Sequence, residues 1–197
     1  MSPSKYKEAL DAYSGLMEEA KYRLLAMDAA LEGITGLPDG AIREFCFLQL
    51  RMLCELIALG CLTAHGDLET GKLKEAYDAD KIIRRLQGLH SEFYPFAAIL
   101  DLHHYQVRPR LDGLTKEELM KLYWRCGDVL HRGSFKAALP SRRYEDGDIE
   151  EIEMWKQKIE TLLGCHTIIM ADNRTTVVFR LTNEDGDVEW RTLEGEE

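Results

Sequence analysis

The run FCFLQLRMLCELIALGCLTA, residues 45–64, decides the fold of this chain. It is apolar almost all the way round a helix, and its charged side chains are Arg51 and Glu55. A run of about 20 apolar residues has the length of a membrane span, but hydrocarbon penalises each such charge by roughly 2.5–3.5 kcal/mol. We therefore predict no membrane span, and instead a buried core helix over 42–65 against which other helices pack.

Four further helices are expected around this core helix. Apolar residues at helical spacing predict them over 3–32, 72–89, 115–132 and 149–163. Thr115 and Glu118 stand three residues apart and match a capping box, which predicts that the fourth helix begins there. Gly133 is placed to end it.

After Gly164 the apolar pattern changes from a helical period to a period of two. Strands are predicted over 166–171, 176–182 and 188–193, with turn residues between them. The segment 91–112 contains two prolines and a β-favouring stretch at 97–107, so it is interpreted as either an ordered loop or a short strand.

The predicted fold class is therefore mainly α. We expect a bundle of about five helices over 1–164, followed by a C-terminal three-stranded antiparallel β meander over 165–197. This tail packs on the helical domain or extends it.

The charge balance limits what the protein can bind. The chain has 35 acidic and 25 basic residues, giving a net charge of −10. Broad, non-specific nucleic-acid binding depends on neutralising phosphates with a basic surface. Any contact with nucleic acid must therefore use a small, local basic patch.

The cysteines indicate a reducing compartment, so we expect a cytoplasmic protein. They are odd in number, form no C-x-x-C pair and lie mostly in apolar helical runs: Cys46, Cys54, Cys61, Cys126 and Cys165. Cys61 and His65 are one helical turn apart, but no second pair matches them, so no metal site is predicted. No phosphate-binding glycine loop or dinucleotide fingerprint is present, and no cofactor is expected.

The segment YWRCGDVLHR, residues 123–132, carries the most specific functional pattern in the chain. Arg125 is followed, after five residues, by His131 near the predicted end of a helix. On an ideal helix, Asp128 lies about 60° from Arg125, and His131 about 60° further in the same direction. The three polar side chains therefore spread over one flank and leave the apolar stripe to the core.

This Arg-x5-His segment resembles the HEPN superfamily of helical bundles, on residues 115–133. The resemblance implies a homodimer and metal-independent cleavage of single-stranded RNA in a defence, stress or toxin system. It also implies catalytic roles for Arg125 and His131. Cys126 stands where the family often has a polar residue directly after the arginine.

The chemistry of these residue types fits such a reaction. A histidine can take the proton of a 2′-hydroxyl or protonate the leaving oxygen, and an arginine can hold a phosphate in a bidentate clamp. Asp128 would orient His131 or raise its pKa. Arg132 is a further contributor to a local basic patch.

Two alternatives stay open. Arg125 with Asp128 can form a simple i,i+3 surface pair, and His131 can be a favourable residue at a helix C-terminus. The chain would then be a non-catalytic helical interaction or regulatory module with a protein partner. Arg51 and Glu55, one turn apart, are predicted to pair with each other, or to line the same site as Arg125.

We predict a homodimer whose interface includes the helix around Gly127, because a glycine inside a helix costs roughly 1 kcal/mol and suggests close approach by another backbone. Light scattering at micromolar concentration should give twice the chain mass of 22.6 kDa. The mass of a single chain at that concentration would contradict this prediction.

Overall fold

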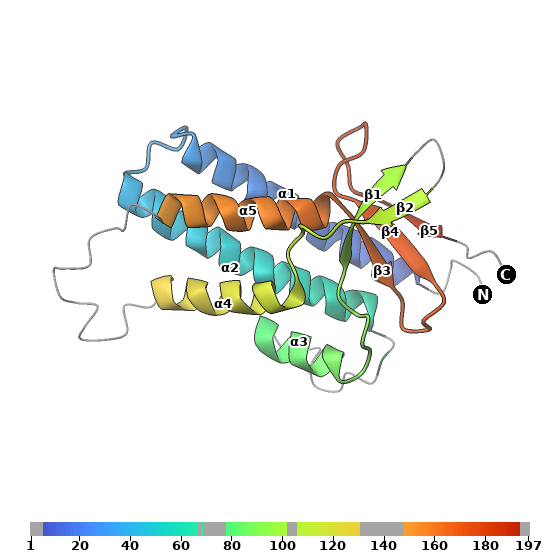
Figure 1. The fold of residues 1–197 in the computed structure, drawn as a ribbon. Helices are drawn as coiled ribbons and strands as arrows, with labels where there is room; N and C mark the ends of the chain where they lie inside the picture. Colours follow the sequence, from blue (N-terminus) through green and yellow to red (C-terminus); the bar gives the residue numbers. More distant parts are fainter. Residues whose placement is uncertain (1–5, 67, 69–77, 102–105, 131–147, 194–197) are drawn as a thin grey trace.

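The protein is described by a computed structural model that covers residues 6–66, 68, 78–101, 106–130 and 148–193. Its helices are α1 (Lys7–Leu31), α2 (Asp39–Ala64), α3 (Ala79–Gln87), α4 (Lys116–Leu130) and α5 (Asp148–Gly164). Its strands are β1 (Phe96–Asp101), β2 (Gln106–Pro109), β3 (Cys165–Ile169), β4 (Thr176–Arg180) and β5 (Glu189–Leu193). Figure 1 shows the helices gathered side by side and the strands at one end of the bundle.

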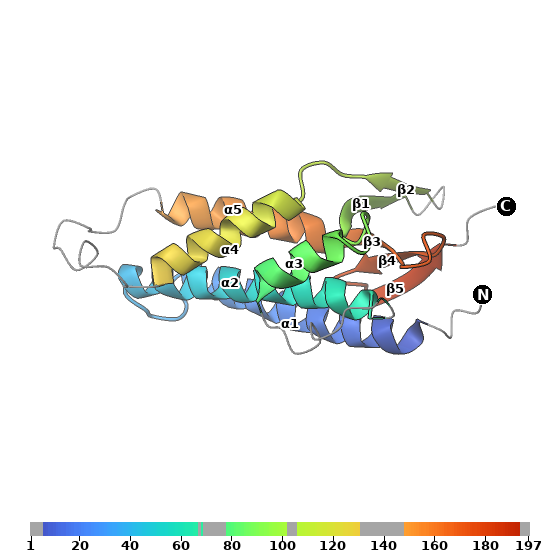
Figure 2. The same cartoon turned by 90° about the horizontal axis from the view of Figure 1, so that it is seen from below.

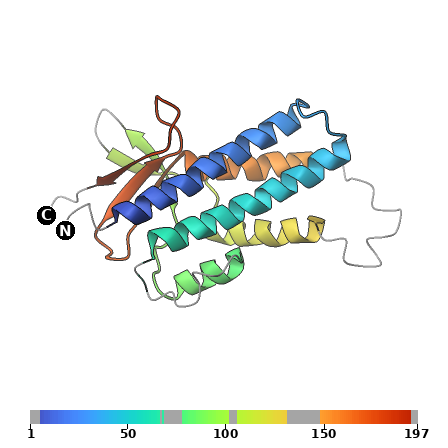
Figure 3. The same cartoon turned by 180° about the vertical axis from the view of Figure 1, so that it is seen from behind.

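Helix α2 is the central helix, as its apolar sequence predicts. It packs against α1, α3, α4 and α5, and the view from behind shows α1 running along it (Figure 3). Gly60 allows α1 to come close, because a Cβ at that position would lie 2.8 Å from Cε2 of Tyr13. The length and composition of α2 would suit a membrane span. Within this fold, 67% of its most apolar 18-residue stretch is buried.

The mainly α fold class and the C-terminal meander are both confirmed. Strands β3, β4 and β5 pair as consecutive antiparallel neighbours, with His166 opposite Phe179 and Phe179 opposite Trp190. They do not form the sheet alone. The strand order is β2-β1-β3-β4-β5, so a hairpin from the middle of the chain extends the meander (Figure 2).

This hairpin decides between the two interpretations of segment 91–112. The described parts of that segment include two paired strands, in which Ile99 lies opposite Arg108 and Ala98 opposite Pro109. β1 in turn pairs with β3 through Phe96 opposite Thr167 and Ala97 opposite His166. Pro109 has no N–H to donate, and it stands at the end of an edge strand, where that loss is tolerated.

Three histidines of the described chain are buried where the helices meet the sheet. At the end of α2, Nε2 of His65 lies 3.0 Å from the carbonyl oxygen of Ile169, and Nδ1 lies 2.8 Å from that of Cys61. His90 follows α3, and its Nε2 lies 3.1 Å from the carbonyl oxygen of Met170. These contacts join the ends of two helices to β3 and the residue that follows it.

The third buried histidine, His166 on β3, contacts two other helices. Its Nε2 accepts a hydrogen bond from Oη of Tyr13 at 2.8 Å, and its Nδ1 donates to the carbonyl oxygen of Leu163 at 3.2 Å. The ring stacks on Phe179 with centroids 5.4 Å apart. Complete burial lowers the pKa of His166 to about 4, because the charged form cannot be solvated there.

We predict that His166 makes the protein less stable in acid. The unfolded chain binds this proton with a pKa near 6.5 and the folded chain with a pKa of about 4. Its contribution is therefore complete above pH about 6.5 and falls by about 3 kcal/mol as the pH approaches 4. Urea unfolding at several pH values should show this fall as a difference between the wild type and His166→Gln.

Glutamine can still bond to Tyr13 but does not titrate, and every carboxylate is common to both proteins. Parallel stability curves for the two proteins between pH 6.5 and 4 would show that His166 is not responsible.

Candidate functional site

Arg125 and Asp128 lie on α4. This helix packs on α2, with α3 on one side and α5 on the other (Figure 2). The predicted capping box starts this helix. The backbone N–H of Glu118 donates to Oγ1 of Thr115 at 3.2 Å, and that of Thr115 donates to Oε2 of Glu118 at 3.0 Å. Lys158 of α5 pairs with Glu118 at 2.9 Å, which fixes the start of α4 against the neighbouring helix.

The side chain of Arg125 crosses from α4 to α5. Its Nε lies 3.1 Å from each carboxylate oxygen of Glu151, and its Nη2 lies 2.8 Å from Oε2 of the same residue. A longer contact of 3.4 Å joins Nη2 to Oδ1 of Asp148. The hydrogen bonds from Arg125 lower the pKa of Glu151, so this carboxylate stays ionised. The Arg125 side chain nevertheless remains 37% exposed.

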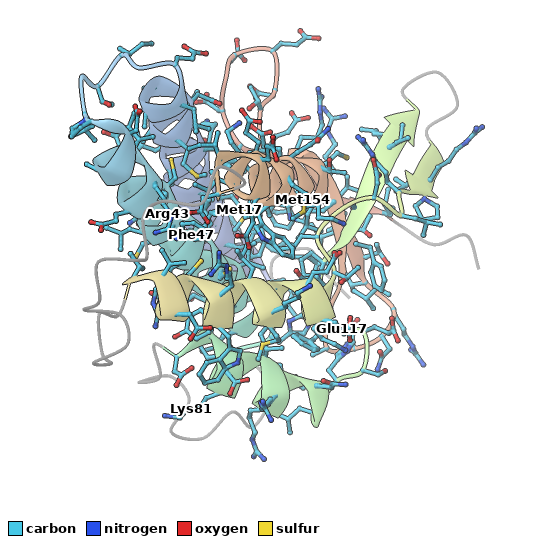
Figure 4. All side chains as sticks on the ribbon, turned by 60° about the vertical axis from the view of Figure 1, so that its left-hand side comes forward. Met17, Arg43, Phe47, Lys81, Glu117 and Met154 are labelled. Atoms are coloured by element: carbon cyan, nitrogen blue, oxygen red, sulfur yellow. The ribbon has the colours of Figure 1, made fainter. Side chains whose placement is uncertain are left out.

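Arg43 of α2 completes a charged cluster with these residues. Its Nε lies 2.5 Å from Oδ2 of Asp148, whose side chain is only 7% exposed. Phe47 lies one turn along α2, and the guanidinium groups of Arg43 and Arg125 lie 5.3 and 5.5 Å from the centre of its ring. Figure 4 shows Arg43 and Phe47 next to each other on α2. We call Arg43, Phe47, Arg125, Asp148 and Glu151 the charged cluster; its two arginines and two carboxylates balance.

Arg51 and Glu55 pair with each other, as predicted. Nε of Arg51 lies 3.3 Å from Oε1 of Glu55, and the two side chains are 26% and 20% exposed, so they are partly rather than fully buried. Nη2 of Arg51 also donates to Oη of Tyr123 at 2.9 Å, and its guanidinium lies 4.3 Å from the centre of that ring. Burial raises the pKa of Glu55, and the positive charge of Arg51 partly offsets this rise.

The structure does not bring this pair together with Arg125. Arg51 contacts α4 on the side of Tyr123, which on an ideal helix is about 160° round from Arg125. The described contacts of Arg51 are with Glu55 and Tyr123, and Arg125 shares none of them. Of the residues proposed from the sequence, Arg125 and Asp128 share one flank, and Arg51 and Glu55 lie at another.

Gly127 has an explanation within a single chain. A Cβ at this position would lie 3.4 Å from Nη1 of Arg51, so the glycine leaves room for that guanidinium. The sequence suggested close approach by another backbone, whereas the neighbour that the structure identifies is a side chain. Dimerisation through this part of α4 stays a prediction.

Asp128 is exposed on α4 and makes no ion pair with the described part of the chain. The simple i,i+3 pair of Arg125 with Asp128 is therefore not what holds Arg125, because the partners of Arg125 come from α5. His131 and Arg132 lie outside the described residues. Their roles remain predictions from the sequence.

Four residues of the charged cluster were not predicted from the sequence as site residues: Arg43, Phe47, Asp148 and Glu151. One signal for two of them was present: Arg43, Phe47, Arg51 and Glu55 recur every four residues and so form one stripe along α2. The acidic partners on α5 follow α4 only after a long segment, and no local pattern connects them with Arg125.

The cysteines nearest these residues lie in the core. Cys126 is buried beneath Arg125, and burial raises the pKa of its thiol to about 12, so it stays protonated. Cys61 and His65 are also buried, and His65 is engaged by backbone oxygens. Within the described ranges, no group of three or more histidine, cysteine or acidic side chains is arranged to hold a metal ion.

We predict that Asp148 is the carboxylate that stabilises the charged cluster most. Asp148→Ala should lower the free energy of unfolding by about 1–3 kcal/mol, because it removes a buried acceptor shared by Arg43 and Arg125. Glu150 is a matched control, since it lies in the same first turn of α5 but is exposed. Glu150→Ala should cost less than about 1 kcal/mol in the same urea titration. Equal losses for the two variants would show that the helix terminus, and not the cluster, needs the charge.

Comparison of the chain with protein-family models, curated proteins and solved structures finds no match. The resemblance to the HEPN superfamily therefore rests on the residues of this sequence.

Proposed function

We propose that this chain is a HEPN-like, metal-independent endoribonuclease of a defence, stress or toxin system, acting as a cytoplasmic homodimer on single-stranded RNA. Arg125 would bind the scissile phosphate, and His131 would carry the proton. Asp128 would support His131, and Arg132 would add positive charge beside it. The observation that carries the proposal is the geometry of Arg125.

Arg125 combines a fixed position with partial exposure. Two contacts from its Nε and one from Nη2 hold it on Glu151, and the guanidinium lies 5.5 Å from the centre of the Phe47 ring. An arginine fixed in this way needs little ordering when it binds an anion. Its exposed surface, 37% of the side chain, is where a phosphate would reach it.

The partner arrangement also allows an exchange of anions. The contact of Arg125 with Asp148 is the longest ion pair in the cluster, at 3.4 Å, and Asp148 has a closer partner in Arg43 at 2.5 Å. A phosphate oxygen can therefore replace Asp148 at Arg125 without leaving that buried carboxylate unpaired. Glu151 would keep the guanidinium oriented during the exchange.

The proposed reaction needs one base and one acid. His131 would take the proton of the 2′-hydroxyl, the 2′-oxygen would attack phosphorus, and the bond to the 5′-oxygen would break as that oxygen is protonated. The products would be a 2′,3′-cyclic phosphate and a 5′-hydroxyl. In a symmetric dimer, a second copy of the same histidine could supply the acid, and Arg125 would stabilise the charge on the phosphate.

A specific observation favours a second candidate function. The charged cluster is balanced, with two arginines facing two carboxylates, which is how a purely structural ion-pair network is built. In that case the chain is a non-catalytic helical interaction module with a protein partner. The activity of purified protein separates the two candidates.

We predict that the protein cleaves single-stranded RNA in the presence of EDTA. His131→Ala should lower the rate by about 10²–10⁴-fold, because it removes the proton carrier. Asp128→Asn should have a smaller effect, since the histidine remains. The dependence on salt should be modest, because an acidic chain can offer few cations to phosphates.

Arg125 needs a more careful variant, because it also joins α4 to α5. Arg125→Ala is expected to lower stability as well as activity, whereas Arg125→Lys keeps the charge and loses the bidentate geometry. Arg84→Ala serves as a control, since Arg84 is 72% exposed on α3. A mixed RNA pool left intact by folded wild-type protein would reject the nuclease and favour the interaction module.

A further inference from the structure

Trp124 is a large aromatic side chain that the core does not use. It precedes Arg125 on α4 and is 58% exposed. The inward stripe of the same helix is complete without it, because Leu119, Leu122 and Cys126 are fully buried. On an ideal helix, Trp124 lies about 160° from Leu122, on the opposite face.

The indole ring is held from one side. Its centroid lies 6.2 Å from that of Tyr123, with the ring planes at 72°. Tyr123 is itself fixed by Arg51, which donates to its hydroxyl at 2.9 Å and covers its ring, and Arg51 is held by Glu55. This chain of contacts gives the Arg51–Glu55 pair a physical role, because it supports the tyrosine against which Trp124 packs.

Cations flank the exposed ring on one side. Lys121 lies about 60° and Arg125 about 100° round the helix from Trp124 in the same direction. Lys121 is exposed and makes no ion pair with the described residues. Two exposed carboxylates, Glu117 at about 20° and Asp128 at about 40°, lie in the same direction between Trp124 and Lys121, so any positive potential is confined to Lys121 and Arg125. The surface therefore consists of an aromatic ring beside a few charged side chains, and it is not a broad basic groove.

A flat, exposed indole beside cations suits one ligand in particular. An unpaired base of a single strand can stack on it, while the adjoining phosphates lie toward Lys121 and Arg125. A paired base inside a duplex has both faces covered, so it cannot stack in this way.

We propose that Trp124 is the stacking platform for an unpaired base of single-stranded RNA next to the phosphate that Arg125 binds. This inference rests on the proposed function for its RNA substrate, but it concerns binding and not cleavage. It also assigns the preference for single strands to one residue. Trp124 is thus a positioning residue, and it takes no part in proton transfer.

The test measures binding with RNA that cannot be cleaved. Oligonucleotides carrying 2′-O-methyl groups lack the attacking hydroxyl, so the wild-type protein can be titrated with a single strand and with the matching duplex. Trp124 fluorescence should be quenched by the single strand and not by the duplex. Trp155 is buried and Trp190 is half-buried on β5, so the quenching that Trp124→Ala removes is the part that reports Trp124.

Three variants separate stacking from other effects. Trp124→Ala should weaken single-strand binding by about tenfold or more, and Trp124→Phe should recover part of the loss because it keeps a ring. Tyr22→Ala is the matched control, since Tyr22 is an aromatic residue that is 73% exposed on α1. It should bind like the wild type. If RNA is cleaved, Trp124→Ala should raise KM more than it lowers kcat.

The outcomes are distinct for the two proposals. Single-strand binding through Trp124 without any cleavage of ordinary RNA would support the platform and reject the nuclease. Unchanged binding by Trp124→Ala, or the absence of binding to any single strand, would overturn the platform. Loss of the dimer in Trp124→Ala without RNA, measured by sedimentation, would overturn it too, because a second copy would then occupy this surface.

Discussion

Helix α2 can be stable only when other elements cover nearly its whole circumference, because it is apolar on almost every side. α1, α3, α4 and α5 all pack against it, and a glycine at position 60 lets Tyr13 of α1 come within contact. Burial of this apolar surface is the main favourable contribution to folding. The arrangement of the other helices, and therefore of every candidate site residue, follows from how they cover α2.

A stripe on α2, made of Arg43, Phe47, Arg51 and Glu55, supplies side chains that contact α4. Arg43 and Phe47, near the start of the stripe, meet Arg125 and the acidic residues of α5. Arg51, one turn further, meets Tyr123 from the other side of α4. Charged groups on a helix surrounded by apolar neighbours need partners, since an unpaired buried charge is costly. The same stripe thus both holds Arg125 in place and supports the aromatic residues beside it.

The sheet is joined to the bundle by buried hydrogen bonds of histidine side chains. His65 and His90 reach the backbone around the end of β3, and His166 reaches back from β3 to Tyr13 of α1. Each contact crosses between segments that are far apart in sequence. The buried imidazole of His166 satisfies two polar groups at once, the hydroxyl of Tyr13 and the carbonyl of Leu163, which suits a boundary between apolar layers.

The sequence by itself determined the fold class, the core helix and the meander, because apolar periodicity and turn residues are local signals. It also determined the capping box at Thr115 and the pairing of Arg51 with Glu55, which depend on residues three or four positions apart. Only the tertiary structure decided that segment 91–112 forms strands beside β3, since both strands lack a distinctive alternation of their own. It likewise decided that Arg125 pairs with Glu151 and not Asp128, because that choice depends on where α5 lies beside α4, which no local pattern specifies.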